Sequence, residues 1–82
     1  MTENLDLASL LERLDPERVD AFREAWVRAT RALDMDEREA AKAFGVSVST
    51  AGRWRFGRTH PHPALIRAIY KRLSRMLREK KA

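Results

Sequence analysis

The clearest structural pattern in the chain lies in residues 37–56, which read EREAAKAFGVSVSTAGRWRF. The first eight of these residues contain no helix breaker and are rich in Ala and Glu, which favour helix. Gly45 then permits the left-handed backbone with which many helices end. Ser47 or Ser49 can cap a second helix, which Gly57 ends. The segment therefore predicts two short helices joined by a tight turn.

The two predicted helices divide their side chains between an inner and an outer face. Ala41 is expected where the helices cross, because a methyl group lets two backbones approach closely. The positions that point inward when two helices meet near a right angle are Ala40, Phe44, Val46, Ala51 and Trp54. The positions left on the outer face of the second helix are Ser47, Val48, Ser49, Gly52 and Arg53. The pattern predicts a small apolar core beneath an exposed second helix.

A longer helix is predicted before this pair. Asp15, Pro16 and Glu17 form a helix start, with Asp as the cap, Pro at the first position and an acid that the helix dipole favours. One apolar stripe follows at helical spacing and contains Val19, Phe22, Trp26, Ala29 and Leu33. This helix is therefore expected to face the core.

The remaining segments add a loop and two further helices. Residues 58–63 are predicted to form a loop, because two prolines bias the residues before them to extended conformations. Residues 63–80 show a basic amphipathic pattern in which Ile69 belongs to the apolar face. Residues 1–15 contain leucines at helical spacing and predict an amphipathic helix before the main domain, residues 16–82. The expected fold class is all-α, with four to five short helices.

Length and composition narrow the classes of protein to consider. The chain has 82 residues and no cysteine, which allows one small hydrophobic core without a disulfide framework or a thiolate zinc site. The start of the chain lacks a basic region and the mean hydropathy is −0.55, so we expect neither a signal peptide nor a membrane span. The expected location is the cytoplasm.

Charge is distributed unequally along the chain. Residues 1–41 contain 6 Arg and 11 acids, a net charge of −5, whereas residues 42–82 contain 11 basic side chains and the single acid Glu79, a net charge of +10. Such asymmetry is typical of a nucleic-acid or anionic-membrane partner, with a merely solvated basic surface as the less favoured alternative. A membrane-surface role for residues 64–82 is disfavoured, because the apolar face of that helix is needed for the core.

Residues 37–56 resemble the helix-turn-helix of the Cro/repressor-like, Xre-type family of DNA-binding proteins, and the pattern extends over residues 17–77. The resemblance implies a lambda-repressor-like trihelical core whose recognition helix, near residues 47–56, reads the major groove of double-stranded DNA. It implies a small repressor of transcription associated with the nucleoid.

A homodimer is expected, because one motif spans only a few base pairs and a twofold pair can read half-sites about 34 Å apart. The leucine-rich N-terminal helix and the last helix are the two candidate dimer interfaces, of which we favour the last helix.

The outer face of the second motif helix carries residue types suited to DNA. The Arg53 guanidinium matches guanine O6 and N7, and a Val48 methyl suits the thymine methyl. The predicted base contacts are Val48, Ser49, Gly52 and Arg53. The predicted phosphate contacts are Arg38, Lys42, Ser47, Thr50, Arg55, Arg58 and His60. The residues predicted to form the structural core are Phe22, Trp26, Ala41, Phe44, Gly45, Val46, Ala51, Trp54 and Ile69.

Three residues besides Ala51, which is smaller than the usual branched residue, depart from the family pattern. Glu37 replaces the neutral amide that often grips a phosphate at the start of the first motif helix, and a carboxylate repels phosphate unless it is turned away. Arg55 and Phe56 replace an acid and a small polar residue. We expect Arg55 to increase nonspecific attraction to DNA, and Phe56 to pack against the last helix, with stacking on DNA bases as the alternative.

Other classes of function have less support. His60 and His62 form an H-x-H pair without a third ligand at a suitable spacing, so no metal is expected. The sequence contains no nucleophile elbow or phosphate-cradling glycine loop, so we expect neither catalysis nor a cofactor. The main alternative is a protein-interaction module, an adaptor or antitoxin-like protein, that binds a protein partner through the acidic first half and residues 5–14.

Overall fold

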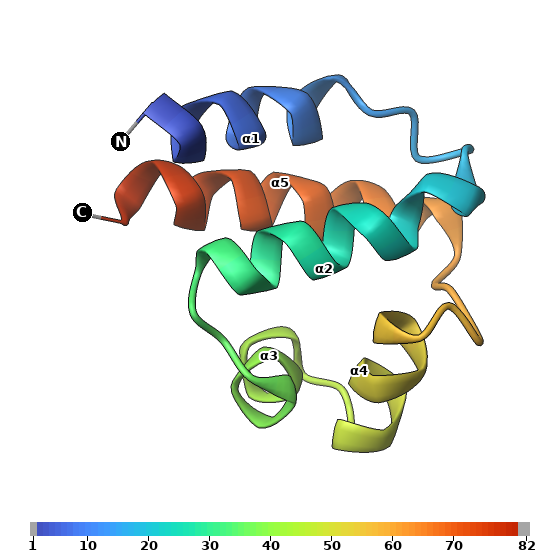
Figure 1. Cartoon of the computed structure of the whole chain (residues 1–82). Coiled ribbons are helices and arrows are strands. Elements are labelled where there is room, and N and C mark those ends of the chain that lie inside the picture. Colours follow the sequence, from blue (N-terminus) through green and yellow to red (C-terminus); the bar gives the residue numbers. More distant parts are fainter. Residues whose placement is uncertain (1, 81–82) are drawn as a thin grey trace.

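A computed structural model describes residues 2–80 as helices joined by short connections, which confirms the expected all-α fold class (Figure 1). The α-helices in this range are α1 (Thr2–Arg13), α2 (Phe22–Ala32), α3 (Glu37–Phe44), α4 (Val48–Arg55) and α5 (Pro63–Glu79). A single 3-10 turn, η1 (Val19–Ala21), leads into α2. None of these helices combines the length and the apolar character needed to cross a membrane.

Local capping signals set the ends of α3, α4 and α5. The Asp36 carboxylate accepts a hydrogen bond from Glu39 N at 2.8 Å, and the Glu39 carboxylate accepts one from Asp36 N at 3.0 Å. Ser47 caps α4 by accepting from Thr50 N at 3.0 Å. His62 caps α5, since its Nδ1 accepts from Ala64 N at 3.0 Å.

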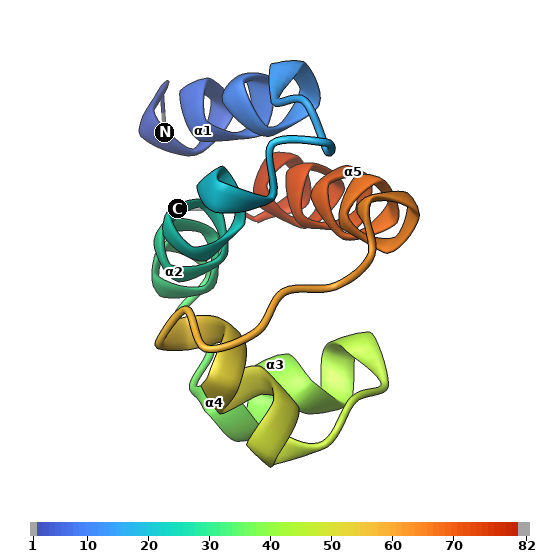
Figure 2. The same ribbon diagram turned by 90° about the vertical axis from the view of Figure 1, so that its right-hand side faces the viewer.

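The helices form three levels. Helices α2 and α5 make the central layer, α1 covers one side of it, and the α3–α4 pair covers the other, as the two views show (Figures 1 and 2). α1 packs mainly along α5, while α4 packs against both α3 and α2. α1 is thus part of the same core, because its residues Leu7, Ala8 and Leu11 are buried.

An aromatic cluster joins the central layer to α4. Trp54 meets Trp26 edge to face with ring centroids 5.1 Å apart, and meets Phe22 in the same way at 5.5 Å. Tyr70 of α5 stacks on Phe22 at 6.1 Å. Phe44 of α3 meets Trp26 at 5.4 Å. These rings fix the position of the α3–α4 pair on α2.

Most of the predicted core residues lie inside the molecule. The buried ones are Phe22, Trp26, Ala41, Ala51, Trp54 and Ile69. Phe44 and Val46 are half-buried and pack against this core. The assignment of Gly45 to the core is wrong, since Gly45 is exposed. Its φ of 67° ends α3, and a Cβ built there would meet nothing within 4 Å, so Gly45 serves the turn through its backbone alone.

The predicted start of the second helix is also wrong. The Asp15 carboxylate accepts from Glu17 N at 2.9 Å, but this bond makes a turn rather than a helix cap. Arg18 has a ψ of 75°, outside the helical region, and therefore separates that turn from η1. α2 then begins at Phe22, several residues later than the Asp-Pro-Glu pattern predicts.

Candidate nucleic-acid interface

α4 has one buried side and one exposed side. Ala51 is 0% exposed and Trp54 is 4% exposed, and both face the core. Val48 is 46% exposed, and Ser49 and Arg53 are exposed on the other side of the helix. Among residues 2–80 the Arg53 side chain makes no hydrogen bond or ion pair. Its guanidinium is thus available to a ligand.

The hydroxyl groups at the start of α4 are partly engaged with each other. The Ser47 hydroxyl accepts from Thr50 N and donates to the Thr50 hydroxyl oxygen at 2.9 Å. Ser47 is exposed and Thr50 is half-buried. The proton of the Thr50 hydroxyl stays available to donate, so Thr50 can still contact a phosphate beside the N-terminus of α4.

Gly52 does not belong to the outer face, contrary to the sequence prediction. A Cβ at this position would lie 3.5 Å from the Glu37 Oε2 atom, in ordinary van der Waals contact. Gly52 is half-buried and faces α3. A methyl group would therefore fit beside the Glu37 carboxylate, and the glycine offers no side-chain group to a DNA base.

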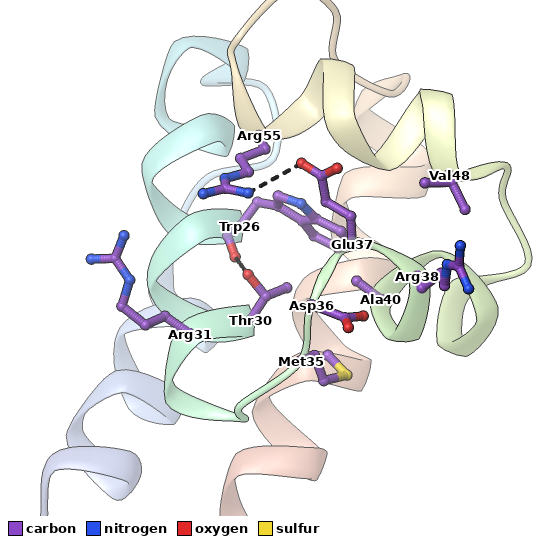
Figure 3. Close-up of a pocket in the computed structure, with 10 residues that line it drawn as sticks. All are labelled: Trp26, Thr30, Arg31, Met35, Asp36, Glu37, Arg38, Ala40, Val48 and Arg55. Atoms are coloured by element: carbon purple, nitrogen blue, oxygen red, sulfur yellow. Dashed lines mark hydrogen bonds and ion pairs between the residues drawn. The ribbon is translucent and has the colours of Figure 1, made fainter.

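Glu37 and Arg55, two of the departures from the family pattern, are partners in the structure. Arg55 Nη1 donates to Glu37 Oε1 at 3.3 Å and links the last turn of α4 to the first turn of α3 (Figure 3). The Arg55 side chain is 54% exposed and that of Glu37 is 34% exposed. In this pair the Arg55 charge partly neutralises the Glu37 carboxylate, which by itself would repel DNA at the start of α3. The same contact restrains the Arg55 side chain and so reduces its freedom to contact phosphate.

This ion pair borders a surface pocket of about 510 Å³ between α2, α3 and α4 (Figure 3). Trp26, Met35 and Ala40 form apolar parts of the wall, and Asp36 and Arg38 add opposite charges at its edge. The mixture of acids and arginines gives the pocket no single charge. It is therefore a less suitable phosphate site than the outer face of α4.

Phe56 is 64% exposed, which contradicts the prediction that it packs against the last helix. Residues two apart on a helix point in nearly opposite directions, and Trp54 already occupies the inward position. The Arg55 guanidinium lies 5.5 Å from the centroid of the Phe56 ring. Phe56 thus extends the exposed surface at the end of α4.

The chain turns sharply after Phe56 because of Gly57. Its φ is 73°, and a Cβ there would lie 2.8 Å from Arg23 Cδ. Arg23 Nε donates to the carbonyl oxygen of Arg55 at 3.2 Å and so satisfies the C-terminal end of α4. The sequence prediction missed this role of Arg23, because the contact joins residues 32 positions apart.

The remaining predicted phosphate contacts are exposed but spread over three segments. Arg38 and Lys42 are four residues apart on α3 and share one face of it. Arg58 follows α4, and its backbone N–H donates to the Arg53 carbonyl oxygen at 2.9 Å. His60 Nδ1 lies 3.0 Å from the Pro61 carbonyl oxygen. Each of these side chains has access to solvent.

Arg72 is a cation near this region that the sequence prediction did not assign. Its guanidinium lies 5.5 Å from the Phe44 ring centroid and so connects α5 with the end of α3. Within residues 2–80 no group of three or more His, Asp or Glu side chains is placed to hold a metal ion. His62 is occupied as the cap of α5.

The exposed face of α4 is therefore the candidate interface, with Val48, Ser49 and Arg53 at its centre. Comparison of the chain with protein-family models, with curated proteins and with solved structures finds no match.

Proposed function

We propose that the chain binds double-stranded DNA as a helix-turn-helix protein of the Cro/repressor-like type and that it regulates transcription as a small repressor. The observation that carries the proposal is the two-sided character of α4. Its inner side is held by an aromatic cluster, whereas its outer side presents Arg53 and Ser49 without partners among residues 2–80. A rigid helix with free donors suits the major groove.

In this proposal the residues of α4 divide between base reading and positioning. Arg53 reads guanine through a bidentate contact, Ser49 contacts a base edge and Val48 contacts a thymine methyl. Phosphate contacts come from the start of α4, through the Thr50 hydroxyl, and from the exposed cations around it. Those cations are Arg38, Lys42 and Arg58. The Ser47 hydroxyl is left out of this set, because its proton is donated to Thr50.

A homodimer is part of the proposal, but neither of the two interfaces expected from the sequence suits it. Most of the large apolar residues of α5 are buried within the chain, with Leu65 at 47% exposure as the exposed exception. A twofold contact through the cationic outer face of α5 would oppose like charges. α1 and α4 lie on opposite sides of the central layer, so a contact through α1 would turn the two α4 helices away from each other (Figures 1 and 2). We therefore place the dimer contact beside α4, formed when two copies occupy one operator.

Selection of bound sequences from random duplexes tests the proposal. We expect enrichment of a site with guanine at a fixed position, and binding that weakens linearly with the logarithm of salt concentration by about 0.9 per phosphate contact. Absence of binding to any duplex at low salt would contradict the proposal.

A second candidate function, binding of a protein partner, is favoured by one observation. A groove of about 210 Å³ between α1 and α2 is lined by Leu7, Leu10, Leu14 and Ala25, with Asp20, Glu24 and Arg28 among the residues around it. Such a groove suits the apolar face of a partner helix. If duplex binding fails, the corresponding test measures how tightly wild-type protein and the Leu10→Asp variant each bind an immobilised protein partner.

A further inference from the structure

α5 carries a row of cations that the proposed DNA interface does not use. Arg67, Lys71 and Arg75 are spaced four residues apart and therefore lie along one face of the helix. All three side chains are exposed, and none of them forms an ion pair within residues 2–80. We call these three residues the α5 basic row.

The α5 basic row lies on the side of α5 that borders α1. Its neighbours Ser74 and Arg78 both bind Glu12 of α1, with distances of 2.9 Å from Ser74 Oγ and 2.8 Å from Arg78 Nη2. Lys71 and Arg75 line the same shallow pocket as Glu12. Because α1 and α4 lie on opposite sides of the central layer, the α5 basic row is separate from the outer face of α4 (Figures 1 and 2).

Arg72 shows that the cations of α5 divide into two groups. It lies one position after Lys71 but points to the other side of the molecule, where it covers the Phe44 ring of α3. Two acids border the α5 basic row. Glu12 already receives two hydrogen bonds from Arg78, and Glu79 follows Arg75 by four residues on the same helix. Glu79 offsets one of the three cations at most, so the row keeps a net positive charge.

We propose that the α5 basic row binds the phosphate backbone of a second DNA segment, so that one molecule bridges two duplexes. The inference rests on the proposed function of α4, which holds the first duplex. Three cations in line along a helix suit a polyanion, and each phosphate that they neutralise releases counterions. Contacts to phosphate carry no sequence information directly, so we expect this contact to be independent of base sequence.

The same observations disfavour a lipid membrane as the ligand. A helix bound to a membrane surface inserts its apolar face among the acyl chains. The apolar face of α5 is buried in the protein core, with Ile66 and Leu73 at 0% exposure and Ile69 at 3%. The exposed apolar residues near the start of α5 are Ala64, Ala68 and Leu65, the last at 47% exposure, and one leucine with two alanines provides little surface for insertion.

Capture of a second duplex tests the bridging proposal. A biotinylated duplex on beads is saturated with the full chain at low salt and then offered a fluorescent duplex. Wild-type protein is expected to retain the fluorescent duplex. The variant R67Q/K71Q/R75Q is expected to lower capture about tenfold or more and to keep its affinity for a single duplex within about threefold of wild type. The matched control R13Q/R28Q/R31Q removes the same charge from α1 and α2 and is expected to capture like wild type.

The possible results separate this inference from the proposed function. Capture that is unchanged in R67Q/K71Q/R75Q would assign bridging to a second α4 in a dimer and overturn the inference. If R67Q/K71Q/R75Q loses capture and single-duplex affinity equally, the α5 basic row and α4 form one binding surface for a single duplex. This result would also overturn the inference. If wild-type protein binds one duplex with base preference but captures no second duplex, the bridging inference fails and the proposed function of α4 stands.

A different failure would remove both proposals. If wild-type protein binds no duplex at low salt, the proposed function and the bridging inference both fail. Co-sedimentation with phosphatidylserine vesicles that is lost in R67Q/K71Q/R75Q would then assign the α5 basic row to an anionic lipid surface.

Discussion

The contact between α1 and α5 and the contact between α3 and α4 join two helices in different ways. α1 and α5 bury long aliphatic side chains, including Leu11 at 1% exposure and Leu77 at 1%. α3 and α4 bury small ones, with Ala41 at 3% exposure and Ala51 at 0%. Small side chains bring two backbones close but remove less apolar surface from water. The α3–α4 pair therefore depends on the aromatic residues of α2 for its stability.

The ion pair of the α1–α5 contact also has more and shorter hydrogen bonds than the ion pair of the α3–α4 contact. Arg78 binds Glu12 through two nitrogen atoms, at 2.8 and 3.0 Å, and Ser74 adds a third bond to the same carboxylate. Arg55 binds Glu37 through one bond of 3.3 Å. The α1–α5 contact is thus suited to hold the molecule together, and the α3–α4 contact to present an exposed helix. The following experiments test this contrast.

Replacement of the Trp54 ring should have the largest effect. Trp54→Ala removes a buried aromatic that contacts two other rings, and we expect a loss of about 3–5 kcal/mol in the free energy of unfolding. Phe56→Ala, the matched control, removes a ring that is 64% exposed and should leave the free energy of unfolding nearly unchanged. Urea denaturation of both variants measures the difference, and similar losses would mean that the faces of α4 are misassigned.

Replacement of Arg53 should change base preference more than stability. Arg53→Ala removes an exposed guanidinium, and we expect a loss of about 1–3 kcal/mol in discrimination at one base pair. Arg58→Ala should instead weaken binding to all duplexes and reduce the salt slope by about 0.9. Binding of selected and random duplexes at several salt concentrations measures both effects. An equal loss on every sequence for Arg53→Ala would contradict its role in base reading.

The two glycines with positive φ should differ in their tolerance of a methyl group. Gly45→Ala places a Cβ in open space, and we expect a loss of about 1–2 kcal/mol from the left-handed backbone alone. Gly57→Ala adds a Cβ 2.8 Å from Arg23 Cδ and should lose more stability. Thermal unfolding of the two variants gives the comparison. Equal losses would show that the Arg23 side chain moves aside freely.

The ion pair between α3 and α4 should contribute little to stability. A double-mutant cycle with Glu37→Gln and Arg55→Gln should give a coupling free energy of about 0.2–1 kcal/mol, because both side chains have access to solvent. The same variants test function, since Glu37→Gln releases Arg55 and removes an acid near DNA. We expect Glu37→Gln to increase duplex affinity, and unchanged affinity in a gel-shift titration would remove this pair from the interface.

The Glu12 pair should make the α1–α5 contact sensitive to acid. Hydrogen bonds from Arg78 and Ser74 hold the pKa of Glu12 below its usual value of 4.5. A lowered pKa in the folded state stabilises the protein above pH 4.5, and this contribution is lost as the pH falls through the folded-state pKa. The difference in urea midpoint between wild type and Glu12→Gln should therefore shrink between pH 6 and pH 3. A constant difference would mean that the carboxylate charge is not involved.

Local patterns in the sequence predicted the elements around α3 and α4 well. Gly45 ends α3 and Ser47 caps α4 because both effects depend on residues only a few positions away. The start of α2 was predicted wrongly, since Asp15 and Pro16 favour a turn as well as a helix. Local chemistry alone did not distinguish these two outcomes.

The predicted exposure of the α4 side chains was correct where it follows from helical periodicity. Val48, Ser49 and Arg53 are exposed, as their spacing relative to Trp54 requires. Gly52 was misplaced, because the carboxylate that it faces comes from another helix.

The sequence by itself determined the helical periods, the end of α3 at Gly45 and the excess of positive charge in the second half, because each depends on residue type and short-range spacing. Only the tertiary structure decided that Glu37 pairs with Arg55 and that the α5 basic row lies on a different side from α4. Contacts between distant residues depend on the angles at which helices cross. Those angles are set by the packing of the whole core.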